Sequence, residues 1–207
     1  MKVLLINGSP NNDGCTFTAL SEVAGALEEN DIKAEIFHIG NKPVRGCIGC
    51  GKCKQVGKCV FGDDVCNGMI AKMVEADGIV IGSPVYFAGP NGALCALLDR
   101  AFYANYARTF IHKPGAAVVS CRRMGASATL DRLNKYFTIA QMPVVSSQYW
   151  NGVHGIEAEH VRADLEGLQT MRVLGRNMAW LLKNIKEGTK PPQPEATREF
   201  TCFHDGK

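Results

Sequence analysis

The sequence predicts an α/β fold, a doubly wound five-stranded parallel sheet with helices on both faces, and three observations support it. Short apolar runs bounded by turn residues recur along the chain, as buried parallel strands do. Segments with apolar residues at helical spacing separate these runs, and strands that alternate with helices are typical of parallel sheets. Hydrophobic residues make up 46% of the 207 residues, which is enough for one sizeable core.

The amino-terminal part begins with a strand at residues 2–7, which ends in the turn Gly8-Ser9-Pro10. A helix is expected at 16–30 from its apolar spacing, and a second strand at 33–39 from its alternating pattern. Residues 40–64 have no periodicity and contain four cysteines, so they are predicted to form a long loop, and loops of this length are usually functional or disordered.

The later elements continue the alternation of strand and helix. They are expected at 65–75 (helix), 78–82 (strand), 91–106 (helix), 115–120 (strand), 126–141 (helix), 143–147 (strand) and 157–186 (helical region). No internal repeat or linker is evident, so residues 1–186 are expected to form one domain with 40–64 as an insertion. Residues 187–207 are expected to form a tail that docks through Phe200 and Phe203.

Charge and composition exclude several classes of function. The net charge of +3 gives no reason to expect nucleic acid or an anionic membrane as a partner. No apolar stretch is long enough to span a bilayer, and the short apolar start is typical of a strand rather than a signal peptide. The expected compartment is the reducing cytoplasm, where nine cysteines indicate free thiols, metal ligation or redox chemistry.

Three loops that leave strand ends have the chemistry of a ligand site, and ligands of such sheets bind at the carboxyl ends of the strands. Residues 8–16 combine glycines, small hydroxyls and a helix start, which suit a phosphate; the alternative is an ordinary capped turn. Residues 82–92 carry two aromatics that would line a planar ring or else pack in the core. Residues 120–126 place two arginines where they would border that ring, or where they are solvated surface groups.

Together these loops resemble those of the NADPH-dependent FMN reductase family, within the flavodoxin-like superfamily. The family's Gly-Ser-Pro-Arg…Gly-Asn-Thr loop corresponds to Gly8-Ser9-Pro10-Asn11 and Gly14-Cys15-Thr16, and its Ser-Pro-Val-Tyr-Phe loop corresponds to residues 83–87. The likeness covers about residues 1–185 in order and spacing. Asn11 replaces the usual arginine and Cys15 the usual asparagine, so the individual phosphate contacts stay open.

The resemblance implies a flavodoxin-like fold with strand order 2-1-3-4-5, bound FMN, and electron transfer from NADH or NADPH to a small acceptor. A quinone, a free flavin, a nitro or azo compound and oxygen are the acceptors considered. The residues that it places around FMN are Ser9, Asn11, Cys15 and Thr16 at the phosphate; Pro84, Val85, Tyr86 and Phe87 along the ribityl chain and ring; and Cys121, Arg122, Arg123 and Gly125 at the far edge of the ring. No side chain is nominated as an acid or base, because the flavin carries the chemistry.

Cys47, Cys50, Cys53 and Cys59 form a C-x2-C-x2-C-x5-C motif in the long loop. Its spacing is too compact for a two-knuckle zinc ribbon and suits a loop around an iron–sulfur cluster. The arrangement resembles that of the iron–sulfur flavoproteins. This resemblance implies a [4Fe-4S] cluster that takes electrons from a ferredoxin-type donor and passes them to FMN. The protein would then be an electron carrier that does not turn over NADH or NADPH. A zinc site and a metal-free packing loop are the alternatives, since FMN reductases without a cluster resemble the same stretch.

Two further expectations concern the surface. His154, which follows Trp150-Asn151-Gly152, lies either near the edge of the ring or on the open surface. The cysteine loop and the long carboxy-terminal helical region add surface to the minimal fold, so a homo-oligomer, a dimer or a tetramer, is expected. A phospho-acceptor domain on the same fold is disfavoured, because Asn7 and Gly8 stand where acidic residues are needed.

Overall fold

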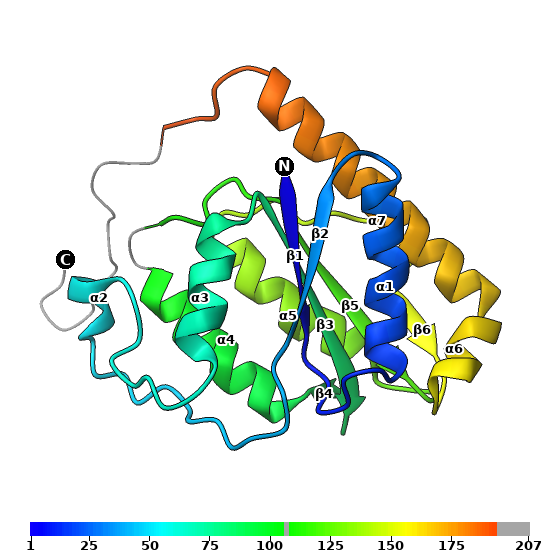
Figure 1. Cartoon of the computed structure of the whole chain (residues 1–207), viewed down its shortest axis with the longest axis horizontal. Helices are drawn as coiled ribbons and strands as arrows, with labels where there is room; N and C mark the ends of the chain where they lie inside the picture. Colours follow the sequence, from blue (N-terminus) through cyan, green and yellow to red (C-terminus); the bar gives the residue numbers. More distant parts are fainter. Residues whose placement is uncertain (106–107, 194–207) are drawn as a thin grey trace, which may run out of the picture.

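The computed structural model of the chain describes residues 1–105 and 108–193, and it contains a parallel sheet flanked by helices on both faces (Figure 1). The strands are β1 (Lys2–Asn7), β2 (Lys33–His38), β3 (Gly78–Tyr86), β4 (Gly89–Pro90), β5 (Gly115–Cys121) and β6 (Gly152–His154). The parallel strands lie in the order β2-β1-β3-β5-β6, and β4 pairs antiparallel with β3. This is the predicted flavodoxin-like order, with a short added strand.

The helices divide between the two faces of the sheet. They are α1 (Cys15–Glu28), α2 (Cys53–Val56), α3 (Cys66–Glu75), α4 (Gly92–Ala104), α5 (Ala126–Ile139), α6 (Ala158–Ala163) and α7 (Leu165–Glu187). One face of the sheet packs against α3, α4 and α5, and the other against α1, α6 and α7 (Figure 1). The short α2 lies in the cysteine loop beside the first of these layers, and its Cys53 packs in the core of that face.

The alternation of side chains along β1 explains why one sheet has two cores. Leu4 and Ile6 pack in the core of the first face, whereas Val3 and Leu5 pack in the core of the second, and all four are fully buried. A strand that is apolar on both faces needs a helical layer on each side, as the continuous apolar run of residues 2–7 predicts.

The predicted strand at 143–147 is wrong. Val144 forms only an isolated parallel bridge to Gly115, and the last strand of the sheet is instead β6, nine residues further on. Gly115 N donates to the Pro143 carbonyl at 2.9 Å and Val145 N donates to the Gly115 carbonyl at 2.8 Å, but the chain then leaves the sheet. Pro143 has no N–H to extend the ladder, and Val145 is the one apolar side chain of this segment that is buried.

Other boundaries also differ from the sequence pattern. The helical region at 157–186 consists of α6 and α7, which Asp164 separates while its carboxylate caps α7 by accepting from Gly167 N at 3.0 Å. The loop at 40–64 contains the single turn α2. The strand predicted at 78–82 continues to Tyr86 and turns back into β4.

The tail lies mostly beyond the region that the structure describes. α7 ends at Glu187, and both Phe200 and Phe203, the expected docking residues, fall outside the described residues. Within residues 1–105 and 108–193, no helix has both the length and the apolar character needed to cross a membrane.

Candidate cofactor site

The loop between β1 and α1 is shaped by its own polar side chains. Asn7 Oδ1 accepts from Ser9 N at 3.1 Å, and Ser9 Oγ in turn accepts from Asn11 N at 3.1 Å. Asn7 Nδ2 also donates to the Asn12 carbonyl at 3.3 Å. These short-range bonds fix the backbone of the predicted phosphate loop before any ligand binds.

The start of α1 leaves amide groups for an anion. Its N-cap residue, Gly14, makes no side-chain capping bond, and the first turn contains no acidic residue. Unpaired amides and the helix dipole at such an end both favour a phosphate. Burial raises the pKa of the Cys15 thiol, so this side chain stays neutral beside the expected phosphate.

Thr16 connects the phosphate loop to the end of β5. Its buried hydroxyl lies 2.9 Å from Ser120 Oγ, across 104 positions of sequence. The start of α1 and the carboxyl end of β5 are thereby joined at the edge of the sheet where ligands of such folds bind.

Asn91 ties the first two loops together and was not predicted. Its Nδ2 donates to the Gly8 carbonyl at 2.8 Å, and its backbone N donates to Ser83 Oγ at 3.0 Å. Its Oδ1 caps α4 by accepting from Ala93 N at 3.0 Å. The capping role is detectable in sequence as an asparagine just before an apolar helix, but its long-range bond to Gly8 is not.

The aromatic residues at the end of β3, Tyr86 and Phe87, face solvent. Phe87 and Ala88 both have positive φ, +50° and +57°, and form the two-residue connection to β4. Phe87 is fully exposed and Tyr86 is exposed, while Pro84 and Val85 are half-buried. Core packing, the alternative for these two aromatics, is therefore wrong, and both rings are accessible to a ligand.

The third loop meets the second at Gly125. A Cβ at this position would lie 2.8 Å from Ala88 Cα and 3.0 Å from Val85 Cγ1, and its φ is +94°. Cys121 is buried, which raises its pKa, whereas Arg122 and Arg123 are exposed. The loops predicted to hold the ring are thus in contact, with the arginines on the open surface.

A hollow of about 500 Å³ lies beside this third loop. Arg123, Gly125, Trp150 and His154 are among the residues that line it. His154 Nδ1 is 3.7 Å from Asp164 Oδ2, and the His154 side chain is exposed. Its placement at the edge of the ring stays a prediction.

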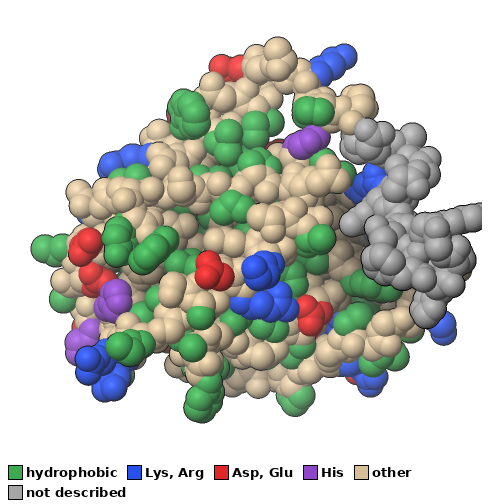
Figure 2. All heavy atoms as spheres, turned by 180° about the vertical axis from the view of Figure 1, so that it is seen from behind, with side chains coloured by type: hydrophobic (Ala, Val, Ile, Leu, Met, Phe, Trp, Pro, Cys, Tyr) green, Lys and Arg blue, Asp and Glu red, His purple; other side chains and the backbone are tan. Residues whose placement is uncertain are grey.

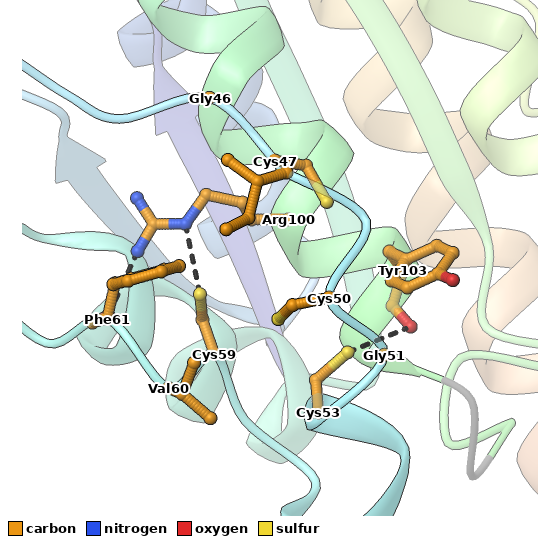
Figure 3. Close-up of a pocket in the computed structure, with 11 residues that line it drawn as sticks. Gly46, Cys47, Cys50, Gly51, Cys53, Cys59, Val60, Phe61, Arg100 and Tyr103 are labelled. Carbon is orange, nitrogen blue, oxygen red and sulfur yellow. Dashed lines mark hydrogen bonds between the residues drawn. The ribbon is translucent and has the colours of Figure 1, made fainter.

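The four motif cysteines line a single second pocket, which Figure 3 shows between the long loop and α4. Cys47 and Cys50 are exposed, whereas Cys53 on α2 is buried and Cys59 is half-buried. The Cys53 thiol donates to the Tyr103 carbonyl at 3.9 Å, and burial raises its pKa. In the part of the chain that the structure describes, no three His, Cys, Asp or Glu side chains gather as ligands of one metal ion.

Cys59 makes three hydrogen bonds with Asn67 and Arg100, two residues that the sequence analysis did not single out. Asn67 Oδ1 accepts from Cys59 N and Asn67 Nδ2 donates to the Cys59 carbonyl, both at 2.9 Å. Arg100 Nε donates to Cys59 Sγ at 3.2 Å. Asn67 and Arg100 lie 8 and 41 positions away from Cys59, and no local sequence signal connects them to it.

The sequence pattern of the NADPH-dependent FMN reductase family matches residues 1–157 of the chain. The chain belongs to this family. It is a flavoprotein family of FMN-dependent oxidoreductases, in agreement with the loop chemistry above.

Several relatives of this FMN reductase family member are named iron-sulfur flavoproteins. An iron-sulfur flavoprotein of Methanocaldococcus jannaschii is 36% identical over 194 residues, which cover 90% of this chain and all of the relative. An iron-sulfur flavoprotein of Methanosarcina thermophila is 29% identical over 90% of this chain and 98% of its own length. A solved WrbA-like flavodoxin of Agrobacterium tumefaciens superposes with a TM-score of 0.63 at 16% identity, covering 88% of this chain and 97% of that one, which shows the fold.

Proposed function

We propose that the chain is an iron–sulfur flavoprotein electron carrier. In this proposal Cys47, Cys50, Cys53 and Cys59 hold a [4Fe-4S] cluster, the three strand-end loops hold FMN, and a ferredoxin-type protein is the electron donor. The observation that carries the proposal is that all four cysteines line one pocket. Arg100 lines the same pocket and donates a hydrogen bond to Cys59 Sγ.

The donor set supports a polynuclear cluster over a single zinc ion. Four thiol groups and no imidazole or carboxylate belong to the motif, and thiolates are the ligands that iron–sulfur clusters take. The compact C-x2-C-x2-C-x5-C spacing also suits a loop around a cluster better than the two separated cysteine pairs of a zinc ribbon.

The roles proposed for the FMN site follow from its contacts. Ser9 and Asn11 belong to the loop that precedes α1, and Cys15 and Thr16 to its first turn, so the proposal assigns the phosphate to this helix start. The exposed rings of Tyr86 and Phe87, the backbone of Pro84 and Val85, and the loop from Cys121 to Gly125 would enclose the isoalloxazine. When bound, FMN supplies one- and two-electron chemistry, and the chain supplies binding, orientation and electrostatics.

A second candidate is turnover of NADH or NADPH with reduction of a small acceptor. The hollow of about 500 Å³ beside Gly125 supports it, because pockets for small molecules have volumes of about 300–1,000 Å³. Steady-state oxidation of NADH or NADPH separates the two functions: turnover with a quinone, flavin or nitro compound supports this candidate, and its absence with every acceptor leaves the electron carrier.

The central experiment is purification without oxygen, followed by an absorption spectrum with iron and sulfide analysis. We expect the bands of FMN and about four iron and four sulfide per chain. Cys50→Ser is expected to lose iron and sulfide but keep FMN, whereas Cys95→Ala, outside the motif, keeps both. A yellow protein with FMN and no iron would overturn the cluster, and a colourless protein that does not quench added FMN fluorescence would overturn the whole proposal.

A further inference from the structure

Arg100 carries a charge that is almost completely removed from solvent. It lies on α4, and its side chain is 1% exposed. A buried guanidinium is stable only when it is paired and its N–H groups are satisfied, so its contacts show which groups the fold brings to it.

These contacts lie on both limbs of the cysteine loop. NH1 donates to the Arg45 carbonyl at 3.2 Å, before the first motif cysteine, and NH2 donates to the Phe61 carbonyl at 3.0 Å, after the last one. NH1 also forms an ion pair with Asp64, which is nearly buried itself. One side chain from α4 thus fastens the entry and the exit of the loop to the body of the protein. Figure 3 shows the contacts of Arg100 with Phe61 and Cys59.

Asp64 balances the positive charge of Arg100 by pairing with NH1, whereas the sulfur of Cys59 is contacted by Nε. Its Oδ1 accepts from Cys66 N at 3.0 Å, and its Oδ2 accepts from Arg45 N at 3.4 Å. These bonds keep the carboxylate in place at NH1, which leaves the Nε–H of Arg100 directed at Cys59 Sγ.

Cys59 differs from the other three cysteines in this contact. Within the described residues it is the one motif sulfur that accepts a hydrogen bond from a cationic side chain, while Cys53 Sγ donates to a carbonyl and Cys47 and Cys50 are exposed. With its backbone N–H and carbonyl both bonded to Asn67, its sulfur has a defined position before a cluster binds.

A hydrogen bond from a cation to a ligating sulfur withdraws negative charge from it. Reduction adds one electron to a cluster, so a donor at the sulfur stabilises the reduced state more than the oxidised state. The direction of the effect is a higher reduction potential.

We infer that Arg100 is a positioning residue that fixes the Cys59 sulfur and raises the reduction potential of the cluster. This inference rests on the proposed function, since it needs a cluster in the pocket. It assigns to α4, outside the cysteine loop, the control of how readily the cluster accepts an electron.

The test is a redox titration of anaerobically prepared protein, with the spectrum of the reduced cluster as the readout and the FMN potential as an internal reference. The variant Arg100→Gln with Asp64→Asn removes both charges, so no unpaired carboxylate stays buried. We expect the ratio of reduced to oxidised cluster at a fixed potential to fall about tenfold, which is ~59 mV for a one-electron couple. Arg100→Lys keeps the charge and loses the Nε–H, so a smaller shift in the same direction is expected.

Arg132→Gln is the matched control, because Arg132 is half-exposed and bonded to Asp99 and Tyr136 rather than to the cysteine loop. Its cluster potential should equal that of the wild type. An unchanged potential in the double variant with full iron content would overturn the inference while leaving the proposed function intact. If the double variant takes up no iron, Arg100→Lys decides: a wild-type potential there overturns the inference. Wild-type protein without iron refutes the proposed function itself.

Discussion

Gly125 is the residue at which the second and third loops touch. Its φ of +94° is unfavourable for residues with a Cβ, and an added Cβ would lie 2.8 Å from a backbone atom of Ala88. Gly125→Ala should therefore push the two loops apart and weaken FMN binding about tenfold, ~1.4 kcal/mol. Fluorescence quenching of FMN titrated with apoprotein measures this affinity.

Gly68→Ala is the matched control for that substitution. Gly68 lies on the exposed side of α3, where an added Cβ meets nothing within 4 Å. FMN affinity should be unchanged in this variant. Equal affinities of the wild type and Gly125→Ala would show that the loop contact does not shape the flavin site.

The residues of the loops could be predicted from sequence, whereas the residues that hold them together could not. Ser9, Tyr86 and Gly125 stand in local motifs, because backbone turns and helix starts need particular residue types at short spacing. Asn91 contacts Gly8 across 83 positions and Arg100 contacts Cys59 across 41, so only the folded chain brings these pairs together. The sequence around Arg100 does not indicate which distant residues its side chain contacts.

The ion pairs of Glu35 predict how the contribution of one residue to stability depends on pH. Its carboxylate forms an ion pair with Lys72 and lies 3.3 Å from Lys2 Nζ. The hydrogen bond from Lys72 is the main reason that the pKa of Glu35 lies below its usual value, and Lys2 lowers it further. Stabilisation from a lowered pKa is complete above the unfolded value of about 4.3 and is lost as pH falls through the folded value.

Glu35→Gln should therefore lower the free energy of unfolding at pH 7 by at most about 1 kcal/mol, because the group is partly screened by solvent. The difference from the wild type should shrink as the pH falls below 5. Urea unfolding from pH 7 to 3.5 measures it. A difference that stays constant across this range would mean that packing rather than charge is responsible.

At the scale of elements, the sheet edge shows where periodicity is a poor guide. The segment at 143–147 is apolar enough for a strand, yet β6 is only three residues long and pairs with the end of β5 instead. Asn151 explains part of this register: its Nδ2 donates to the Ala117 carbonyl at 3.0 Å, and its carbonyl accepts from Val119 N at 2.9 Å. A buried amide can fix an edge strand, and apolar patterning does not detect it.

The contact between α1 and α7 depends on a small residue at their crossing. A Cβ on Gly175 would lie 2.7 Å from Ala26 Cβ and 2.8 Å from the Val23 carbonyl. Gly175→Ala should separate the helices and lower the free energy of unfolding by about 1–3 kcal/mol, although alanine favours a helix. Urea unfolding measures the loss.

Gly25→Ala provides the opposite result on the partner helix. An added Cβ at this exposed position of α1 meets nothing within 4 Å, so only helix propensity changes. The variant should be more stable than the wild type by about 0.5–1 kcal/mol. Stabilisation by both substitutions would contradict close packing at Gly175.

On the scale of the whole molecule, large apolar side chains are exposed at the end of the sheet where the cofactor loops meet. Phe87, Met124, Tyr149 and Trp150 are all exposed. The face in Figure 2 shows charged side chains of both signs interspersed with apolar ones. A symmetric interface over the loop end would bury these side chains, so light scattering should give a mass of at least twice the 22.4 kDa of one chain.

Phe87→Asp with Met124→Asp tests that assembly, since charges on this surface oppose its burial. The mass should fall toward that of the monomer, while Trp180→Asp, on the exposed side of α7, should leave it unchanged. A wild-type monomer would refute the assembly, and an oligomer that both charged variants leave intact would place its interface elsewhere.

In the proposed function, the charge around the cysteine pocket would favour donor proteins of opposite charge. Residues 40–64 contain five Lys or Arg and two Asp, and one of these aspartates, Asp64, is paired with Arg100. Lys52 and Lys58 are exposed beside Cys53 and Cys59. Cys47 and Cys50 are the exposed members of the motif, so a donor would approach the cluster from this positively charged side, where an acidic carrier of the ferredoxin type is attracted over about one Debye length.

Reduction of the protein by an acidic ferredoxin should therefore slow as salt rises from 50 to 500 mM. Lys52→Glu with Lys58→Glu should lower the second-order rate about tenfold or more at low salt and flatten its salt dependence, because rim charges act mainly on association. Lys186→Glu, at the far end of α7, changes the net charge without changing this surface and serves as the control. Stopped-flow absorbance of the flavin gives the rates. If the control slows electron transfer as much per unit charge as the paired variant does, the net charge of the protein, rather than a docking surface at the cysteine loop, attracts the donor.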